Sequence, residues 1–275
     1  MTTIPTITLH NGVVMPQLGY GVFQVPDDQT EKAVTDALNA GYRSIDTAAI
    51  YGNEAGVGRA LAASGIARED LFITSKLWLS DFGYEATLAA YNTSLEKLGL
   101  EQLDLFLIHW PAPETDLYLE SWRALETLLA EGRVRAIGVS NFLPEHLQRI
   151  IDLGGTVPAV NQVELHPALQ QRDIQAANAA HGIATEAWSP LAQGAVLSEP
   201  AVTAIATAHG RTPAQVILRW HLQQGRIVIP KSVTPARIAE NLDILDFALA
   251  PAELAAIDAL ERDGRTGPHP ASFNG

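Results

Sequence analysis

A strict alternation of short apolar runs with longer helical patterns constrains this chain of 275 residues more than any other feature. Eight runs have the length and composition of buried strands: Leu18–Gly21, Ser44–Thr47, Leu71–Lys76, Leu103–His109, Val134–Ser140, Ala159–Leu165, Ile183–Trp188 and Arg226–Lys231. No linker, repeat or shift in composition divides them. The alternation predicts an α/β protein, a (β/α)8 TIM barrel that residues 1–275 form as a single domain.

The helical patterns lie between and after these runs, and many begin at a proline or stop at a glycine. We expect helices over Thr30–Ala40, Ala55–Ser64, Glu85–Leu98, Ser121–Glu131, Pro144–Leu153, Arg172–His181, Pro200–His209, Pro213–Gln224, Pro235–Leu242 and Pro251–Leu260. The last of them are extra C-terminal helices of the barrel. The tail Gly264–Gly275 is rich in glycine and proline, and we expect it to be irregular.

An N-terminal β-hairpin is predicted ahead of the barrel. Ile7–Leu9 and Val13–Met15 are short alternating runs, and the Asn11-Gly12 pair between them favours a primed two-residue turn. A doubly wound sheet is the alternative to the barrel, and it would bind a dinucleotide through Gly-x-Gly-x-x-Gly after its first strand. The chain has Gly19 and Gly21 but Gln24 in the third position. The barrel is therefore favoured.

Charge and composition exclude several classes of partner. The formal net charge is −13 and the isoelectric point is near 4.9, which argues against a nucleic acid or an anionic membrane. The chain has no cysteine, so disulfides, thiolate catalysis and zinc–thiolate sites are excluded. Its eight histidines are scattered, and we expect no metal. Without a signal-like N-terminus or a long apolar run, we expect a cytoplasmic protein.

Four polar side chains are predicted to meet where the second, third and fourth strands end. Asp46, Lys76 and His109 lie near the carboxyl ends of these strands, and Tyr51 follows in the loop after the second. Active sites of (β/α)8 barrels lie at this end. A lysine beside a tyrosine stabilises the phenolate and lowers the pKa of the phenol, which suits a proton donor. Asp46 would balance the charge of Lys76, and a neutral His109 could hydrogen-bond a carbonyl oxygen.

Each of these residues also has an ordinary structural interpretation. Asp46 and Lys76 could form a buried structural ion pair, His109 could be a core histidine, and Tyr51 could pack on the surface. Their joint placement at successive strand ends favours the functional interpretation.

The second half of the chain carries a different set of polar groups. Ser140, Asn141 and Gln162 could hydrogen-bond an amide-bearing ring that stacks on Trp188, although Asn141 could instead cap a helix and Trp188 could fill the core. Past the eighth strand, Lys231 and Arg237 flank the start of a helix, as in a phosphate site. The alternative is an exposed helix whose scattered charge Glu240 balances.

Several motifs resemble those of the aldo-keto reductases, and together they span the chain. They are Gly-Tyr-Arg-Ser-Ile-Asp-Thr-Ala with Tyr-Gly-Asn-Glu, Thr-Ser-Lys-Leu-Trp, Leu-Asp-Leu-Phe-Leu-Ile-His-Trp-Pro, Gly-Val-Ser-Asn-Phe, Asn-Gln-Val-Glu-Leu-His-Pro and Ile-Pro-Lys-Ser. Within this family the chain most resembles the bacterial 2,5-diketo-D-gluconic acid reductases, through Gln-Leu-Gly-Tyr-Gly-Val-Phe and Glu-Asn-Leu-Asp-Ile-Leu-Asp-Phe.

The resemblance implies a monomeric reductase that binds NADPH and a small carbonyl substrate. It implies a catalytic tetrad of Tyr51, Asp46, Lys76 and His109, with Tyr51 as the acid. The implied cofactor contacts are Ser140, Asn141, Gln162, Trp188, Ser189, Leu191, Gln193, Gly194, Lys231, Ser232, Val233, Arg237, Glu240 and Asn241. The implied substrate contacts are Phe23, Trp78, His109 and Trp110.

The expected reaction is the NADPH-dependent reduction of aldehydes, α-dicarbonyls or keto-sugar acids to alcohols. The segments Phe142–Pro144 and Ser80–Tyr84 and the tail after Asp263 depart from the diketogluconate reductase pattern, so the motifs do not name the substrate. The alternative from another class is a regulatory NADPH-binding subunit, like the channel β-subunits that share this fold. A metal-dependent barrel hydrolase would need clustered histidine and carboxylate ligands, which the sequence lacks.

Overall fold

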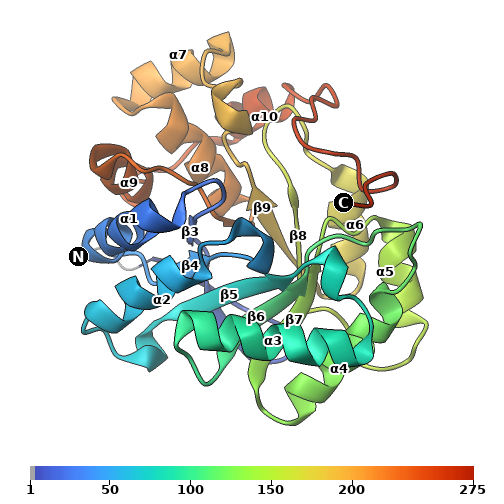
Figure 1. Ribbon diagram of the computed structural model, residues 1–275. Helices are drawn as coiled ribbons and strands as arrows, with labels where there is room; N and C mark the ends of the chain where they lie inside the picture. Colours follow the sequence, from blue (N-terminus) through green and yellow to red (C-terminus); the bar gives the residue numbers. More distant parts are fainter. Residues whose placement is uncertain (1–3) are drawn as a thin grey trace.

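The computed structural model describes residues 4–275 and contains the expected barrel (Figure 1). Met1–Thr3, part of the predicted domain and of the N-terminal stretch considered above, lie outside the described residues. Neighbouring strands pair in parallel and in chain order: β3 (Tyr20–Gly21), β4 (Ser44–Asp46), β5 (Phe72–Leu77), β6 (Leu103–Ile108), β7 (Val134–Ser140), β8 (Val160–Glu164), β9 (Ala184–Trp188) and β10 (Ile227–Val228).

The sheet closes on itself between its first and last strands. Leu18 and Val228 form a parallel bridge, the Gly19 N–H donates to the Val228 carbonyl oxygen at 2.8 Å, and the Val228 N–H donates to the Gln17 carbonyl oxygen at 3.0 Å. Closure removes the exposed edges that an open sheet would leave. The predicted fold class is confirmed.

Helices surround the barrel (Figure 1), and all the predicted ones are present. Their bounds are α1 (Asp27–Ala40), α2 (Glu54–Ala63), α3 (Tyr84–Leu98), α4 (Tyr118–Ala130), α5 (Pro144–Ile151), α6 (Arg172–Ala180), α7 (Pro200–His209), α8 (Pro213–Gln223), α9 (Pro235–Leu242) and α10 (Pro251–Asp258). Local chemistry sets several ends. Gly41 stops α1 with a φ of 119°, and Thr212 and Gln215 form a capping box at α8.

The N-terminal hairpin is present, but its turn differs from the prediction. β1 (Thr6–Thr8) pairs with β2 (Val14–Pro16) in antiparallel register. The Gly12 N–H donates to the Leu9 carbonyl oxygen, and Gly12 is left-handed with a φ of 85° while Asn11 is not left-handed. The connection is therefore a longer loop with glycine in the left-handed position, and the predicted two-residue primed turn is wrong.

The interior of the barrel changes character from one end to the other. Near the amino ends of the strands it is apolar, with Phe72, Leu105 and Val160 packed together and Leu9 and Met15 of the hairpin segment closing it. Near the carboxyl ends the buried side chains are polar or charged, and they include Asp46, Lys76, Gln162, Glu164 and Glu186. Burying charged groups is costly unless each finds a partner, so this end is where a function is expected.

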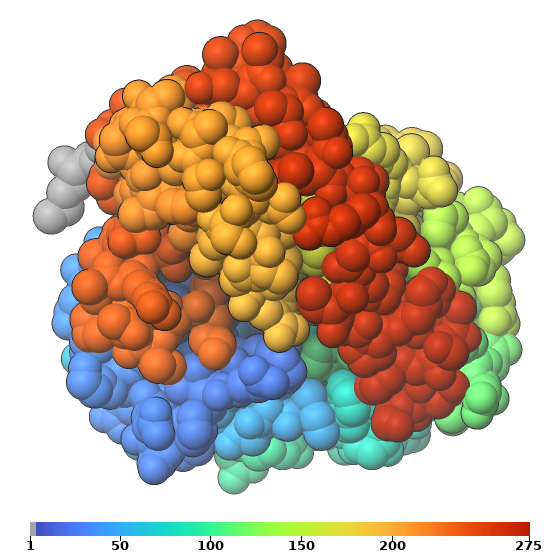
Figure 2. Space-filling view, turned by 90° about the horizontal axis from the view of Figure 1, so that it is seen from above, coloured from blue at the N-terminus to red at the C-terminus, as the bar shows by residue number. Residues whose placement is uncertain are grey.

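The irregular C-terminal tail lies across the polar end of the barrel. From above, Figure 2 shows the tail (red) running over the upper face, with a hollow between it, the gold segment after β9 and the blue segments near the N-terminus. The Gly264 N–H donates to the Ala168 carbonyl oxygen and the Thr266 N–H to the Glu164 carboxylate, at 2.7 Å each, and these bonds anchor its start beside β8. The tail contains neither helix nor strand, as predicted.

Candidate active site

Three strand ends and one loop bring the predicted tetrad together. The Lys76 Nζ atom, fully buried, donates to Asp46 Oδ1 at 2.5 Å and to the Thr47 carbonyl oxygen at 3.0 Å. It also lies 3.5 Å from the Tyr51 hydroxyl. Tyr51 belongs to the short 3-10 helix η1 (Ala49–Tyr51), and its ring is 5.6 Å from the His109 ring. The ammonium of Lys76 thus links the carboxylate to the phenol.

Burial controls the ionisation of these groups. It lowers the pKa of His109 well below the ordinary value, with a further contribution from Lys76, so the imidazole is neutral as expected. Burial also opposes the charge on Lys76, but Asp46 and Tyr51 outweigh it and raise the pKa of Lys76.

The expectation for Tyr51 is wrong in its net direction. Burial raises the pKa of the Tyr51 phenol, and the opposing effect of Lys76 does not overcome it. Tyr51 therefore keeps its proton at neutral pH. That is the state a proton donor needs before the reaction.

A hydrogen-bonded bridge crosses the interior of the barrel next to the tetrad. The side-chain amide of Gln162 on β8 donates from Nε2 to Asp46 Oδ2 on β4 and to Glu186 Oε2 on β9, each at 2.8 Å. Glu186 is fully buried, and burial, followed by the neighbouring Asp46 carboxylate, raises its pKa to about 8. Gln162 thus connects Asp46 of the tetrad with Glu186 on the opposite side of the barrel interior.

The other predicted ring-binding residues form a compact set beside Gln162. The Ser140 hydroxyl donates to the Gln162 carbonyl oxygen at 2.8 Å. The Asn141 amide donates to Ser140 Oγ at 3.1 Å and to the His109 carbonyl oxygen at 3.0 Å. The Trp188 indole N–H donates to Asn141 Oδ1 at 2.8 Å, which fixes the ring. Asn141 has a left-handed φ of 63°, and such strain gathers at functional sites.

The segment after β9 has an unusual backbone. Ser189, Ala192, Gln193 and Gly194 all have positive φ, between 46° and 97°. Left-handed residues next to right-handed ones can turn backbone N–H groups toward one side and form an anion-binding concavity. Here the N–H groups of Ala192 and Gly194 donate to the Ser189 and Leu191 carbonyl oxygens, at 2.8 Å each. Leu191 packs against the core behind this loop. The other backbone N–H groups of this segment could face an anion.

Two exposed cations lie past the eighth strand. Lys231 and Arg237 form no ion pair within residues 4–275. Glu240 accepts a hydrogen bond from the Thr212 hydroxyl at 2.8 Å and, within residues 4–275, forms no ion pair with Arg237. Ser232 and Val233 lie between the two cations at the start of α9, and Asn241 is buried at its end. This end of the site can take a phosphate.

Aromatic side chains lie around Tyr51 and His109. The ring of Phe23 is 5.0 Å from that of Tyr51, and the ring of Trp78 is 5.2 Å from that of His109. Phe273 of the tail packs on Trp110 at 4.4 Å and on Trp78 at 6.2 Å. The predicted substrate-contact residues thus share one aromatic mouth, and the tail completes it.

The chain belongs to the aldo/keto reductase family. The family model matches residues 12–262. The chain is 54% identical over 275 residues to methylglyoxal reductase DkgA of Yersinia pestis, covering 99% of both chains. It is 55% identical over 270 residues to an aldo-keto reductase of Mycolicibacterium smegmatis, covering 98% of both. A solved structure of a Gox0644 variant in complex with NADPH matches with a TM-score of 0.95 at 49% identity, covering 99% of both chains.

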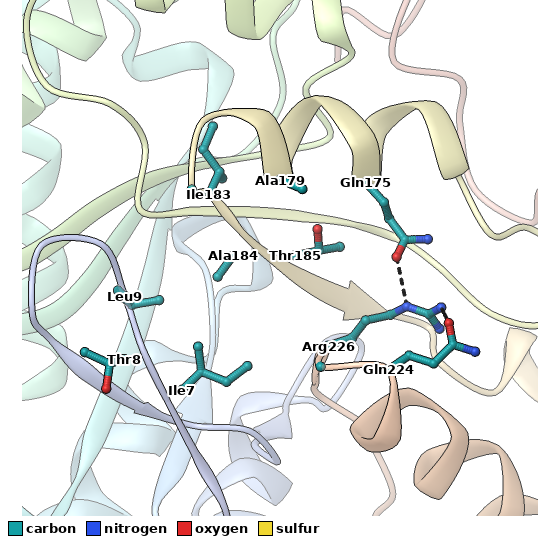
Figure 3. Close-up of a pocket in the computed structure, with 12 residues that line it drawn as sticks. Ile7, Thr8, Leu9, Gln175, Ala179, Ile183, Ala184, Thr185, Gln224 and Arg226 are labelled. Atoms are coloured by element: carbon teal, nitrogen blue, oxygen red, sulfur yellow. Dashed lines mark hydrogen bonds between the residues drawn. The ribbon is translucent and has the colours of Figure 1, made fainter. Parts of the chain in front are cut away.

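A cavity in this reductase lies near the amino ends of the strands (Figure 3). It has a volume of about 350 Å³ and is bounded by Ile7 and Leu9 near the hairpin and by Ile183 before β9. Its charged residue, Arg226, donates to Gln175 at 3.0 Å and stacks on Trp220 at 4.2 Å. The described residues that line the cavity include no carboxylate, histidine or lysine, so it offers no acid–base chemistry.

Residues 4–275 contain no helix that is long and apolar enough to cross a membrane. In the same described part of the reductase, no three histidine or carboxylate side chains are grouped as metal ligands.

Sequence reasoning missed three residues of this site. Glu186 and Glu164 are carboxylates inside apolar strands, the same signal that identified Asp46, and it could have found both. Phe273 lies in the irregular tail, where no periodic pattern predicts which groups a side chain will contact.

Proposed function

We propose that this protein is an NADPH-dependent carbonyl reductase that acts on small, uncharged aldehydes and α-dicarbonyls. The observation that carries the proposal is the position of the buried Lys76 ammonium, 2.5 Å from Asp46 and 3.5 Å from the Tyr51 hydroxyl. The arrangement suits a phenol that must give up a proton and be left as a stabilised phenolate.

The residues of the tetrad divide the proton transfer among them. Bound NADPH supplies the hydride to the carbonyl carbon. Tyr51 donates its proton to the carbonyl oxygen, and Lys76 stabilises the phenolate that remains. Asp46 keeps Lys76 charged despite its burial. His109, neutral in this environment, donates a hydrogen bond that orients the substrate oxygen.

The residues of the second half fit the cofactor. Ser140, Asn141 and Gln162 would hold the nicotinamide carboxamide, and Trp188 would stack on the ring. In the segment Ser189–Gly194, which has several left-handed residues, the N–H groups not used in its own turns would face the pyrophosphate. Lys231 and Arg237, exposed and outside the ion pairs of residues 4–275, would bind the adenosine 2′-phosphate. Leu191, Ser232, Val233, Glu240 and Asn241 complete this proposed set.

The substrate class follows from the character of the mouth. Phe23, Trp78, Trp110 and Phe273 are aromatic, and the neighbouring His109 is neutral, so none of these groups would pair with a carboxylate. This favours an uncharged carbonyl over a keto-sugar acid. The relative named methylglyoxal reductase DkgA supports the same class.

The proposal is tested by NADPH consumption with methylglyoxal, simple aldehydes and 2,5-diketo-D-gluconate. We expect kcat/KM to be highest for methylglyoxal and lowest for the charged sugar acid. Binding of NADPH with no turnover of any carbonyl would contradict the proposal and would favour the regulatory-subunit alternative. If the sugar acid is the preferred substrate, the proposed reaction stands but the proposed substrate class is wrong.

A further inference from the structure

The Gln162 amide is held from one side by two carboxyl groups. Its Nε2 atom donates one hydrogen to Asp46 and the other to Glu186, at equal distances of 2.8 Å. Within residues 4–275, no hydrogen bond engages the Oε1 atom of Gln162. The amide therefore presents its amino group to the interior of the barrel and keeps its carbonyl oxygen available as an acceptor.

Glu186 occupies a position that an apolar side chain would fill at lower cost. It is fully buried in β9, directly opposite Gln162 in the strand register. Its second oxygen, Oε1, has no hydrogen-bond partner among the described residues. Asp46 and Lys76 act on it electrostatically, and burial raises its pKa, so the carboxyl group retains its proton at neutral pH. A group this costly to bury calls for an explanation beyond packing.

We propose that Glu186 is a positioning residue that fixes the orientation of the Gln162 amide, so that its carbonyl oxygen accepts a hydrogen bond from the nicotinamide carboxamide N–H. The inference rests on the proposed function, because it takes the nicotinamide to bind beside Ser140 and Gln162. Turning the amide over would bring its carbonyl oxygen against the Asp46 carboxylate, which cannot donate. It would also take the donor away from Glu186 Oε2, which accepts from Nε2 while the proton of Glu186 is on the unpartnered Oε1. Glu186 thus adds a second anchor to the one that Asp46 supplies.

The consequence is selectivity for a ring substituent that carries an N–H donor. A fixed Gln162 acceptor favours a carboxamide over an acetyl group, which keeps the carbonyl but has a methyl in place of the amino group. One net hydrogen bond corresponds to about threefold to tenfold in affinity. An amide that turns freely could offer either face, and most of that preference would be lost.

The test compares the binding of NADP⁺ and of its 3-acetylpyridine analogue by quenching of tryptophan fluorescence. The wild type is expected to bind NADP⁺ about threefold to tenfold more tightly than the analogue. In Glu186→Leu this ratio is expected to fall toward one, whereas Glu186→Gln, which keeps an acceptor for Gln162, should retain it. An unchanged ratio in Glu186→Leu overturns the proposal, and so does an equal loss in Glu186→Gln.

Two controls separate this inference from the proposed function. Binding of 2′,5′-ADP, which lacks the nicotinamide half, should be the same in all variants. If Glu186→Leu binds 2′,5′-ADP more weakly than the wild type, Glu186→Met is used in its place. The same ratio of NADP⁺ affinity to analogue affinity is then measured. Gln162→Ala should also lose the preference. If Gln162→Ala keeps it, the proposed carboxamide contact is wrong, and absent binding of NADP⁺ to the wild type contradicts the proposed function itself.

Discussion

The two sides of the polar end of the barrel differ in the kind of polar side chain that they carry. On the β4–β6 side, buried Lys76 contacts both Asp46 and Tyr51, and the Tyr51 ring packs on His109. Burial and the neighbouring charges shift the pKa values of Lys76, Tyr51 and His109. On the β7–β10 side, neutral amides and hydroxyls line the opening, and the cations Lys231 and Arg237 stay exposed at its outer end. On the proposed function, the first side moves a proton and the second holds the long, anionic cofactor.

Two buried glutamates, Glu164 and Glu186, show how the surroundings of a carboxyl group set the direction of its pKa shift. Burial acts to raise the pKa of both. Around Glu164, hydrogen bonds from His166, Thr266 and Gly267 outweigh it and lower the pKa to about 2. Glu186 receives one hydrogen bond and faces Asp46, and its pKa rises to about 8. Glu164 is therefore an ionised anchor for the tail, and Glu186 is a neutral member of the core.

The largest effect is expected for Tyr51→Phe, which should reduce catalysis without changing cofactor binding. This change keeps the ring packing and removes only the proton that the phenol donates. General acid catalysis contributes ~10²–10⁴-fold, so kcat for methylglyoxal reduction should fall by that factor. NADPH affinity, measured by fluorescence, should not change. A variant that reduces carbonyls at near the wild-type rate would remove Tyr51 from the mechanism.

For Arg237→Ala we expect the opposite result, weaker cofactor binding with unchanged catalysis. Charge-assisted hydrogen bonds contribute ~1.5–3 kcal/mol, so NADPH should bind about one to two orders of magnitude more weakly while NADH binding stays the same. At saturating NADPH, kcat should be retained. Titrations with both cofactors provide the measurement. Equal losses for NADPH and NADH would place Arg237 away from the 2′-phosphate.

The two glutamates should respond to pH in opposite ways. The pKa of Glu186 is higher in the folded protein than in the unfolded chain, so its contribution to stability is present at acidic pH and is lost as pH rises toward 8. Glu186→Gln should therefore melt like the wild type near pH 5 and at a higher temperature near pH 8. One pH unit across this window corresponds to about 1.4 kcal/mol.

The matched variant is Glu164→Gln. The pKa of Glu164 is depressed in the fold, so its contribution is present at neutral pH and is lost as pH falls toward 2. Glu164→Gln should lower the melting temperature at pH 7, and this difference should shrink in acid. Calorimetry over pH 3–9 measures both variants. Identical pH responses would show that the environments of the two carboxylates do not differ as described.

Much of this architecture is readable from local sequence. Glycine after α1 and the threonine–proline start of α8 fix element ends through backbone chemistry, and apolar runs reveal the strands. The same strand pattern places Asp46, Lys76 and His109 at the polar end of the barrel. These features depend on residues close together in the chain, or on a barrel whose strand order follows the sequence.

Contacts that cross the barrel were beyond such reasoning. Gln162 meets Asp46 from a strand 116 positions away, and Phe273 meets Trp110 from an irregular tail that no periodicity describes. The net direction of the Tyr51 pKa was also missed, because it depends on a balance between burial and Lys76 that only the packed structure defines. The turn of the hairpin differed because a left-handed glycine satisfies a longer loop as well as a primed one.

The most direct test of the central claim, that Tyr51 is the acid and Lys76 tunes it, is the pH dependence of kcat/KM in both directions. Because burial raises the pKa of Tyr51, carbonyl reduction should persist through neutral pH and decline only at alkaline pH as the phenol ionises. Alcohol oxidation, which needs the phenolate, should rise over that same range. In Lys76→Met both transitions should move to higher pH. A reduction profile that falls near pH 6–7 and is unmoved in Lys76→Met would contradict the account and assign the proton to His109.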